Sequence, residues 1–132
     1  MAVGRALPLL GVAHGLGTML VGAVPEGGAA AGPIPALHVI GAGLSIVAGN
    51  AGLAMLGMRG GRLGAGRGYR GASLMLGLFG LANLALLEGN RAAGLALGPD
   101  GLLERGSVYP ITLWEVLTGL ALLGIWREGR RT

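Results

Sequence analysis

The sequence predicts an all-α fold: a four-helix transmembrane bundle, made by one integral membrane domain over residues 1–132. Three observations lead to this class. The chain is 52% hydrophobic and only 12% charged, against about 25% charged residues in soluble proteins. It has apolar segments close to the ~20 residues that cross a bilayer. Its Arg residues gather in alternate connections between these segments.

The expected helices cover approximately residues 6–24, 34–58, 69–87 and 108–126. The first is expected to stay in the protein, because no clear cleavage site and soluble domain follow it. The fourth is expected to begin at Tyr109 and Pro110, since Tyr suits the headgroup level and a first-turn Pro loses no needed hydrogen bond. The 29 Gly residues fit helices that pack closely in lipid.

The charges between the segments predict the orientation. The middle loop carries four Arg and no acid, the C-terminal tail three Arg against one Glu, and Arg5 precedes the first segment. The other two loops together hold four acids and two Arg. Because Arg is enriched on the cytoplasmic side, both termini are expected inside. The alternative role of the middle-loop arginines is to bind anionic lipid headgroups; they are Arg59, Arg62, Arg67 and Arg70.

The loop before the fourth segment is long. It contains a turn signal at residues 98–101, followed by the short piece 102–105. This piece is expected to form a separate amphipathic helix or turn on the outer surface.

Glu115 is the acidic residue inside the apolar segments. A charged carboxylate there costs ~3 kcal/mol on insertion scales, so we expect it to be neutral or hydrogen-bonded to a His or Asn. The helical rise of about 1.5 Å per residue places it ~10 Å below the outer end of its helix. Helix faces and depths predict one polar outer-half pocket, lined by His14, Thr18, His38, Asn83, Thr112 and Glu115.

Asn50 is expected on a different face from His38, where it would contact another subunit or a helix outside the bundle. The inward face of the same segment is expected to contain His38, Gly41, Ala42, Ser45, Gly49 and Gly52.

The chemical inventory favours a protein without cofactor or metal, and it favours a non-enzymatic role. Zero Cys excludes thiolate sites, and an expected depth difference of ~10 Å separates His14 from His38, which disfavours a bis-His haem. The aromatic content of 4% argues against nucleic acid as a partner. Two alternatives stay open. One is a small proton-coupled transporter built around Glu115, and the other is a metal-dependent membrane hydrolase.

Several short motifs resemble the bacterial integral membrane family catalogued as domain of unknown function 998. They are Gly22 with Pro25-Glu26, His38, Gly49-Asn50, and Glu104-Arg105 followed by Val108-Tyr109-Pro110 and Trp114. Family members are usually longer, so the resemblance implies a shortened member that lacks an N-terminal pair of helices. It implies no activity, but it draws attention to an outer-surface motif of Glu26, Glu104, Arg105 and Tyr109.

The sequence thus leads to a multi-pass protein of a bacterial inner or plasma membrane. Its expected role is to bind lipid or partner helices through the polar pocket and the small-residue faces. The expected partners are membrane lipids, a second copy of the chain or another membrane subunit.

Overall fold

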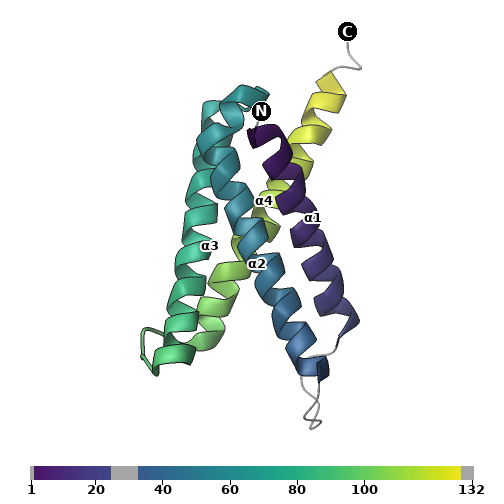
Figure 1. Cartoon of the computed structure of the whole chain (residues 1–132). Helices are drawn as coiled ribbons and strands as arrows, with labels where there is room; N and C mark the ends of the chain where they lie inside the picture. Colours follow the sequence, from purple (N-terminus) through teal and green to yellow (C-terminus); the bar gives the residue numbers. More distant parts are fainter. Residues whose placement is uncertain (1, 25–32, 129–132) are drawn as a thin grey trace.

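The computed structural model describes residues 2–24 and 33–128, and this part of the chain is helical throughout apart from short connections. The helices are α1 (Ala2–Ala23), α2 (Pro33–Arg59), α3 (Arg67–Ala93) and α4 (Asp100–Glu128), with the short 3₁₀ helix η1 (Gly60–Leu63) after α2. The predicted all-α class is confirmed. Successive helices run antiparallel, so the start of α1, η1 and the last turns of α4 lie at one end (Figure 1). The orientation of this end towards the cytoplasm stays a prediction.

Three helices are long and apolar enough to cross a membrane, over Arg5–Ala23, Ala36–Leu63 and Arg67–Ala93. Large apolar side chains cover the outside of the bundle; Met19 is 71% exposed and Met75 is 73% exposed. Apolar surface of this extent is expected to face lipid rather than water. The chain is therefore a membrane protein, and the fourth span, over residues 108–126, stays a prediction.

The fourth helix begins eight residues before the predicted start, at Asp100. The carbonyl of Pro99 accepts hydrogen bonds from the N–H groups of Leu102 and Leu103, and the Asp100 carboxylate suits the positive end of the helix dipole. The prediction of a separate surface helix at 102–105 is wrong, because these residues form the first turns of α4. Pro110 lies inside this helix rather than in its first turn, where it leaves the carbonyl four residues earlier without a helical partner.

The third helix also extends further than predicted, to Ala93, and ends where Gly94 takes the left-handed conformation at φ 63°. Asn90 then fixes the short link to α4. Its Nδ2 donates to the Gly98 carbonyl and to Asp100 Oδ1, both at 2.8 Å, and its Oδ1 accepts from the Leu97 N–H at 2.8 Å. The long loop predicted before the fourth helix is therefore a short link over residues 94–99, held by hydrogen bonds of the Asn90 side chain.

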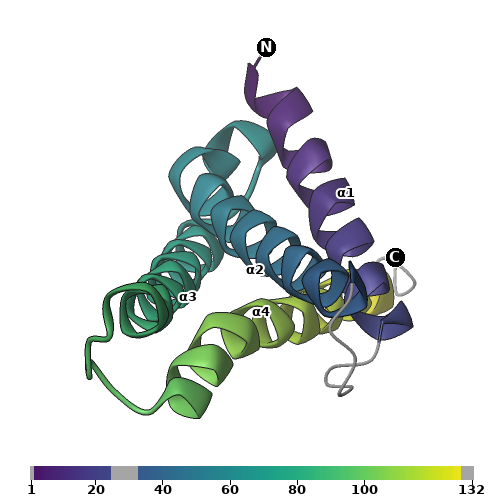
Figure 2. The same ribbon diagram turned by 60° about the horizontal axis from the view of Figure 1, so that its bottom comes forward.

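The second helix is the centre of the fold. It packs against α1, α3 and α4, whereas α1 and α4 make no close backbone contact with each other within the described residues. Figure 2 shows α1 and α3 on opposite sides of α2, with α4 along a third side. Glycines permit the close approach of the pairs: a Cβ on Gly17 would lie 2.5 Å from the Ser45 nitrogen, and one on Gly77 would lie 2.6 Å from the Ala54 nitrogen.

Asn50 lies at the point where α2, α3 and α4 meet. Its side chain is fully buried; Nδ2 donates to the Ile46 carbonyl at 2.9 Å and to the Ser107 carbonyl at 2.8 Å. Its Oδ1 rests against Gly80 without a hydrogen-bond partner. The prediction that Asn50 faces outward is wrong, because α2 has neighbours on three sides and the early start of α4 brings Ser107 across this face.

Candidate functional site: a cleft between α1, α2 and α4

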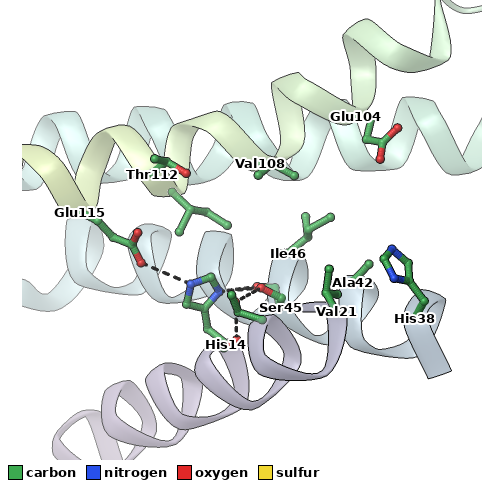
Figure 3. Close-up of a pocket in the computed structure, with 12 residues that line it drawn as sticks. His14, Val21, His38, Ala42, Ser45, Ile46, Glu104, Val108, Thr112 and Glu115 are labelled. Atoms are coloured by element: carbon green, nitrogen blue, oxygen red, sulfur yellow. Dashed lines mark hydrogen bonds and ion pairs between the residues drawn. The ribbon is translucent and has the colours of Figure 1, made fainter. Parts of the chain in front are cut away.

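A cavity of about 380 Å³ lies between α1, α2 and α4 (Figure 3). Its wall is apolar over most of its extent, with Val21, Ala42, Ile46, Val108 and Ile111 among the lining side chains. The polar lining includes five of the six residues predicted for the pocket, namely His14, Thr18, His38, Thr112 and Glu115. Ser45 and Glu104 are the other polar residues of the lining.

Asn83, the sixth predicted pocket residue, does not line this cavity. It lies in a groove of about 490 Å³ between α3 and α4, and its Nδ2 donates to the carbonyl of Phe79 one turn earlier. The placement was wrong because the polar face of α3 packs against α2 and α4, so it cannot reach a cavity next to α1.

His14 is held in place by α2. Its Nδ1 lies 2.9 Å from the backbone carbonyl oxygen of Ser45 and 3.0 Å from the Ser45 hydroxyl. A carbonyl oxygen only accepts hydrogen bonds, so the bond assigns the proton to Nδ1. Gly49 leaves room for the ring: a Cβ there would lie 2.9 Å from His14 Nδ1 and 2.6 Å from Ile111 Cδ1.

The other ring nitrogen of His14 faces Glu115 across the cleft. Nε2 lies 3.4 Å from Oε1, and the two side chains are 23% and 54% exposed, respectively. Because Nδ1 already donates to Ser45, neutral His14 presents a lone pair to the carboxyl group. The contact is attractive only when one further proton is present, either on His14 as an ion pair or on Glu115 as a neutral hydrogen bond. The His14–Glu115 contact bridges α1 and α4, whose backbones make no close contact in the described residues.

Glu115 lies further from the start of its helix than predicted. It is 15 residues into α4, about 22 Å from the start of the helix at a rise of ~1.5 Å per residue. The earlier value of ~10 Å assumed that the helix begins near Tyr109. The cavity therefore extends from the middle of the bundle, at His14 and Glu115, towards the end where α4 begins, at His38 and Glu104 (Figure 3).

Small hydroxyl groups complete the inner end of the cavity. Thr18 Oγ1 donates to the carbonyl of His14 at 2.9 Å, and the Ser45 hydroxyl lies 2.7 Å from Thr18 Oγ1. Since the Thr18 hydrogen is used within α1, Ser45 is the donor of the second bond. Ser45 was expected on the inward face of its helix, but its pairing with His14 required knowledge of how α1 crosses α2.

His38 has a local role at the opposite end. Its Nδ1 lies 2.8 Å from the carbonyl oxygen of Val24, just past the end of α1, so it donates a hydrogen bond to the backbone at this end of the helix. His38 precedes Ser45, the partner of His14, by seven residues on α2, about 10 Å along the helix. Two His residues so separated do not suit the axial positions of one haem. Within residues 2–24 and 33–128, no three His, Asp or Glu side chains gather as a metal site.

A second cavity, of about 250 Å³, lies on the other side of the His14–Glu115 pair. Its walls are apolar, with Leu10, Leu56 and Trp114 among them. Both cavities share His14, Ile111 and Glu115 as lining residues. The pair therefore stands between two cavities in one cleft.

Three residues of the outer-surface motif, Glu104, Arg105 and Tyr109, line a small cavity of about 280 Å³ on α4. Glu104 also lines the main cavity, and Arg105 and Tyr109 also line the groove between α3 and α4. Glu26 lies outside the described residues.

The four middle-loop arginines occur at the end of the bundle near η1. Arg70 donates from Nε and Nη2 to the carbonyls of Gly57 and Met58, at 3.2 and 3.3 Å. It thereby caps the end of α2. A headgroup role for Arg59, Arg62 and Arg67 stays a prediction.

Comparison of the chain with protein-family models, with curated proteins and with solved structures gives no match. The resemblance to domain of unknown function 998 therefore stays a prediction.

Proposed function

We propose that the chain is a non-enzymatic, multi-pass membrane protein that binds a lipid or lipid-like amphiphile in the cleft between α1, α2 and α4. The observation that carries the proposal is the cavity of about 380 Å³, which has apolar walls and a polar pair, His14 and Glu115, at its inner end. Its volume falls within the range of about 300–1,000 Å³ typical of small-molecule sites. An apolar tail suits the walls, and a polar head suits the pair.

The way the helices pack supports access from the bilayer. The α1 and α4 backbones have no close contact within the described residues, so the cleft is bridged by side chains alone. A lipid-soluble molecule can reach such a cleft sideways between two helices. A partner helix in the same cleft is the competing occupant, and it would appear in the test below as a second polypeptide.

Native mass spectrometry of protein extracted in mild detergent tests this proposal. Ala42→Phe places a ring in the cavity, whereas Ala85→Phe adds the same ring on an exposed surface of α3. We expect the wild type and Ala85→Phe to retain a bound amphiphile and Ala42→Phe to lose most of it. Equal retention in both variants would place the amphiphile elsewhere, and a bound polypeptide lost from Ala42→Phe alone would replace lipid as the occupant.

We place the protein in a bacterial inner or plasma membrane, with α4 as a fourth span and both termini inside. The common end of the first and last helices agrees with this arrangement (Figure 1), and the arginine-rich end is expected to face the cytoplasm. A reporter fused after Arg131 should be active inside the cell. Activity of the same reporter outside would reverse the orientation.

A second candidate function is proton-coupled transport. It is favoured by the two cavities that share His14 and Glu115 as a common wall, because a proton-binding group between two cavities can serve either side. In proteoliposomes with an internal pH-sensitive dye, the amphiphile identified by mass spectrometry should then drive proton flux, and Glu115→Gln should abolish it. If the wild type shows no proton flux, the transport function would be refuted and only the binding function would stay proposed. We do not propose the hydrolase alternative, which nothing in the described residues supports.

A further inference from the structure

We infer that the amphiphile is an organic cation, an amine or onium compound, that the free site holds one proton between His14 and Glu115, and that the positive group of the cation displaces this proton. The inference rests on the proposed function, since it concerns the same cavity, and it names the chemical class of the ligand.

The charged groups that line the cavity are unbalanced. The chain has ten Arg residues, yet the lining contains two carboxylates, Glu104 and Glu115, and no arginine. Glu88, by contrast, has Arg91 at 3.6 Å on the surface of α3. Within the part of the chain that the structure describes, no arginine forms an ion pair with either cavity carboxylate, although Arg105 lines a separate small cavity together with Glu104. A cavity whose fixed charges are carboxylates attracts cations and repels anions.

The two carboxylates lie along one side of α4. Glu104 and Glu115 are 11 residues apart, close to three helical turns, which puts them on the same face and about 16 Å apart along the axis. Val108 and Ile111 lie between them and line the same cavity. An elongated cation can thus place its charge at Glu115 while its apolar part follows this face towards Glu104.

The groups around Glu115 determine what a bound cation replaces. α1 contributes His14 at 3.4 Å, α2 contributes the uncharged Ser45 and, at the far end, His38, and α4 contributes Glu104. The Nδ1 proton of His14 is committed to the Ser45 carbonyl. The proton that the cation displaces in the proposed exchange is therefore the one between Nε2 and Oε1.

Exchange of this proton for a cation preserves the charge of the site. In the proposed exchange, the pair holds one proton before binding and is neutral overall. When a monovalent cation contacts the Glu115 carboxylate, the proton leaves to solvent and His14 stays neutral with Nδ1 protonated. The total charge is again zero, so the exchange avoids the cost of an uncompensated charge in a medium of low dielectric constant.

Proton release makes binding depend on pH. If one proton leaves for each cation bound, the affinity for the cation rises as pH rises, by up to tenfold per pH unit while the free site is protonated. By linkage, bound cation lowers the affinity of the pair for the proton by the same factor by which the bound proton lowers the affinity for the cation.

Isothermal titration calorimetry of the full chain in detergent tests the inference with two probes of matched shape, tetraphenylphosphonium and tetraphenylborate. We expect saturable binding of the cation and none of the anion. Titrations in two buffers of different ionisation enthalpy should show about one proton released per cation, and affinity should increase with pH. Glu115→Gln should lower the affinity at least tenfold, whereas Glu88→Gln, which removes a surface carboxylate, should leave it unchanged.

The outcomes separate the inference from the proposed function. Saturable binding of tetraphenylborate but not of tetraphenylphosphonium would overturn the cationic class, while an amphiphile lost from Ala42→Phe would still support the cleft as a binding site. Cation binding without proton release would overturn the exchange. No probe binding, together with no amphiphile sensitive to Ala42→Phe, would overturn both. The comparison of the two probes uses the wild type, so it holds even if Glu115→Gln does not fold.

Discussion

The two sides of α2 differ in how polar groups are used. On the side of α3 and α4, the side chains of Asn50, Ser73 and Ser107 are fully buried and tied to neighbouring helices or to their own helix turn. On the side of α1, the cleft contains the partly exposed side chains of His14 and Glu115, which make a single contact of 3.4 Å with each other. The first region is closely packed, and the second leaves a cavity beside two titratable side chains.

The closely packed side has further polar ties between helices. Trp114 Nε1 donates to Ser73 Oγ at 2.9 Å, and the Tyr69 hydroxyl lies 2.9 Å from Thr118 Oγ1. In lipid, small residues and hydrogen bonds between helices replace the hydrophobic drive. Polar residues in this bundle thus divide into those that hold helices together and those that line a cavity.

The largest expected effect comes from filling a glycine on the packed side. A Cβ at Gly77 would lie 2.6 Å from two backbone atoms of α2, the Ala54 nitrogen and the Asn50 oxygen, and backbone cannot move aside as a side chain can. We expect Gly77→Val to lower the stability by about 3 kcal/mol or more, measured by unfolding in mixed micelles. Gly71→Val is the matched control, since Gly71 lies on the same helix with open space around it. Equal stability of the two variants would contradict the close packing of α2 on α3.

A smaller effect is expected from Asn50→Ala. The change removes the donor for the buried Ser107 carbonyl and leaves a cavity where three helices meet. We expect a loss of about 2 kcal/mol, at the upper end for hydrogen bonds between membrane helices. Asn83→Ala should cost less than about 1 kcal/mol, because Asn83 bonds within its own helix. If the two variants unfold alike, Asn50 does not join α2 to α4.

The smallest effect on stability is expected in the cleft. Glu115→Gln should change the unfolding free energy by less than about 1 kcal/mol, because the Glu115 side chain is 54% exposed and its single ion-pair contact is long. The same substitution should nevertheless alter ligand binding strongly, as described above. A stability loss as large as that of Asn50→Ala would mean that Glu115 holds helices together, as the buried polar residues do.

Most of the polar residues that line the main cavity could be predicted from the sequence. His14, Thr18, His38, Thr112 and Glu115 could be grouped because helical periodicity shows which residues share a face, and helical rise gives their relative depth. The predicted distance of Glu115 from the start of its helix was wrong because Pro110 indicated a helix start there, whereas the helix starts ten residues earlier, at Asp100. Nothing local in the sequence distinguishes a proline in a first turn from one inside a membrane helix whose neighbours support it.

Composition, segment length and a period of 3.6 residues were enough to predict the helical class, the membrane character of the chain and five of the polar residues that line the main cavity. Only the tertiary structure decided which inward face meets which neighbour. In the folded chain, Asn50 is buried where α2 meets α3 and α4, Asn83 lies in the groove between α3 and α4, and His14 lies 3.4 Å from Glu115. The physical reason is that periodicity describes one helix at a time, whereas the partners of a side chain depend on how the helices cross. Here α2 has three neighbours, while α1 and α4 meet through side chains alone in the described residues.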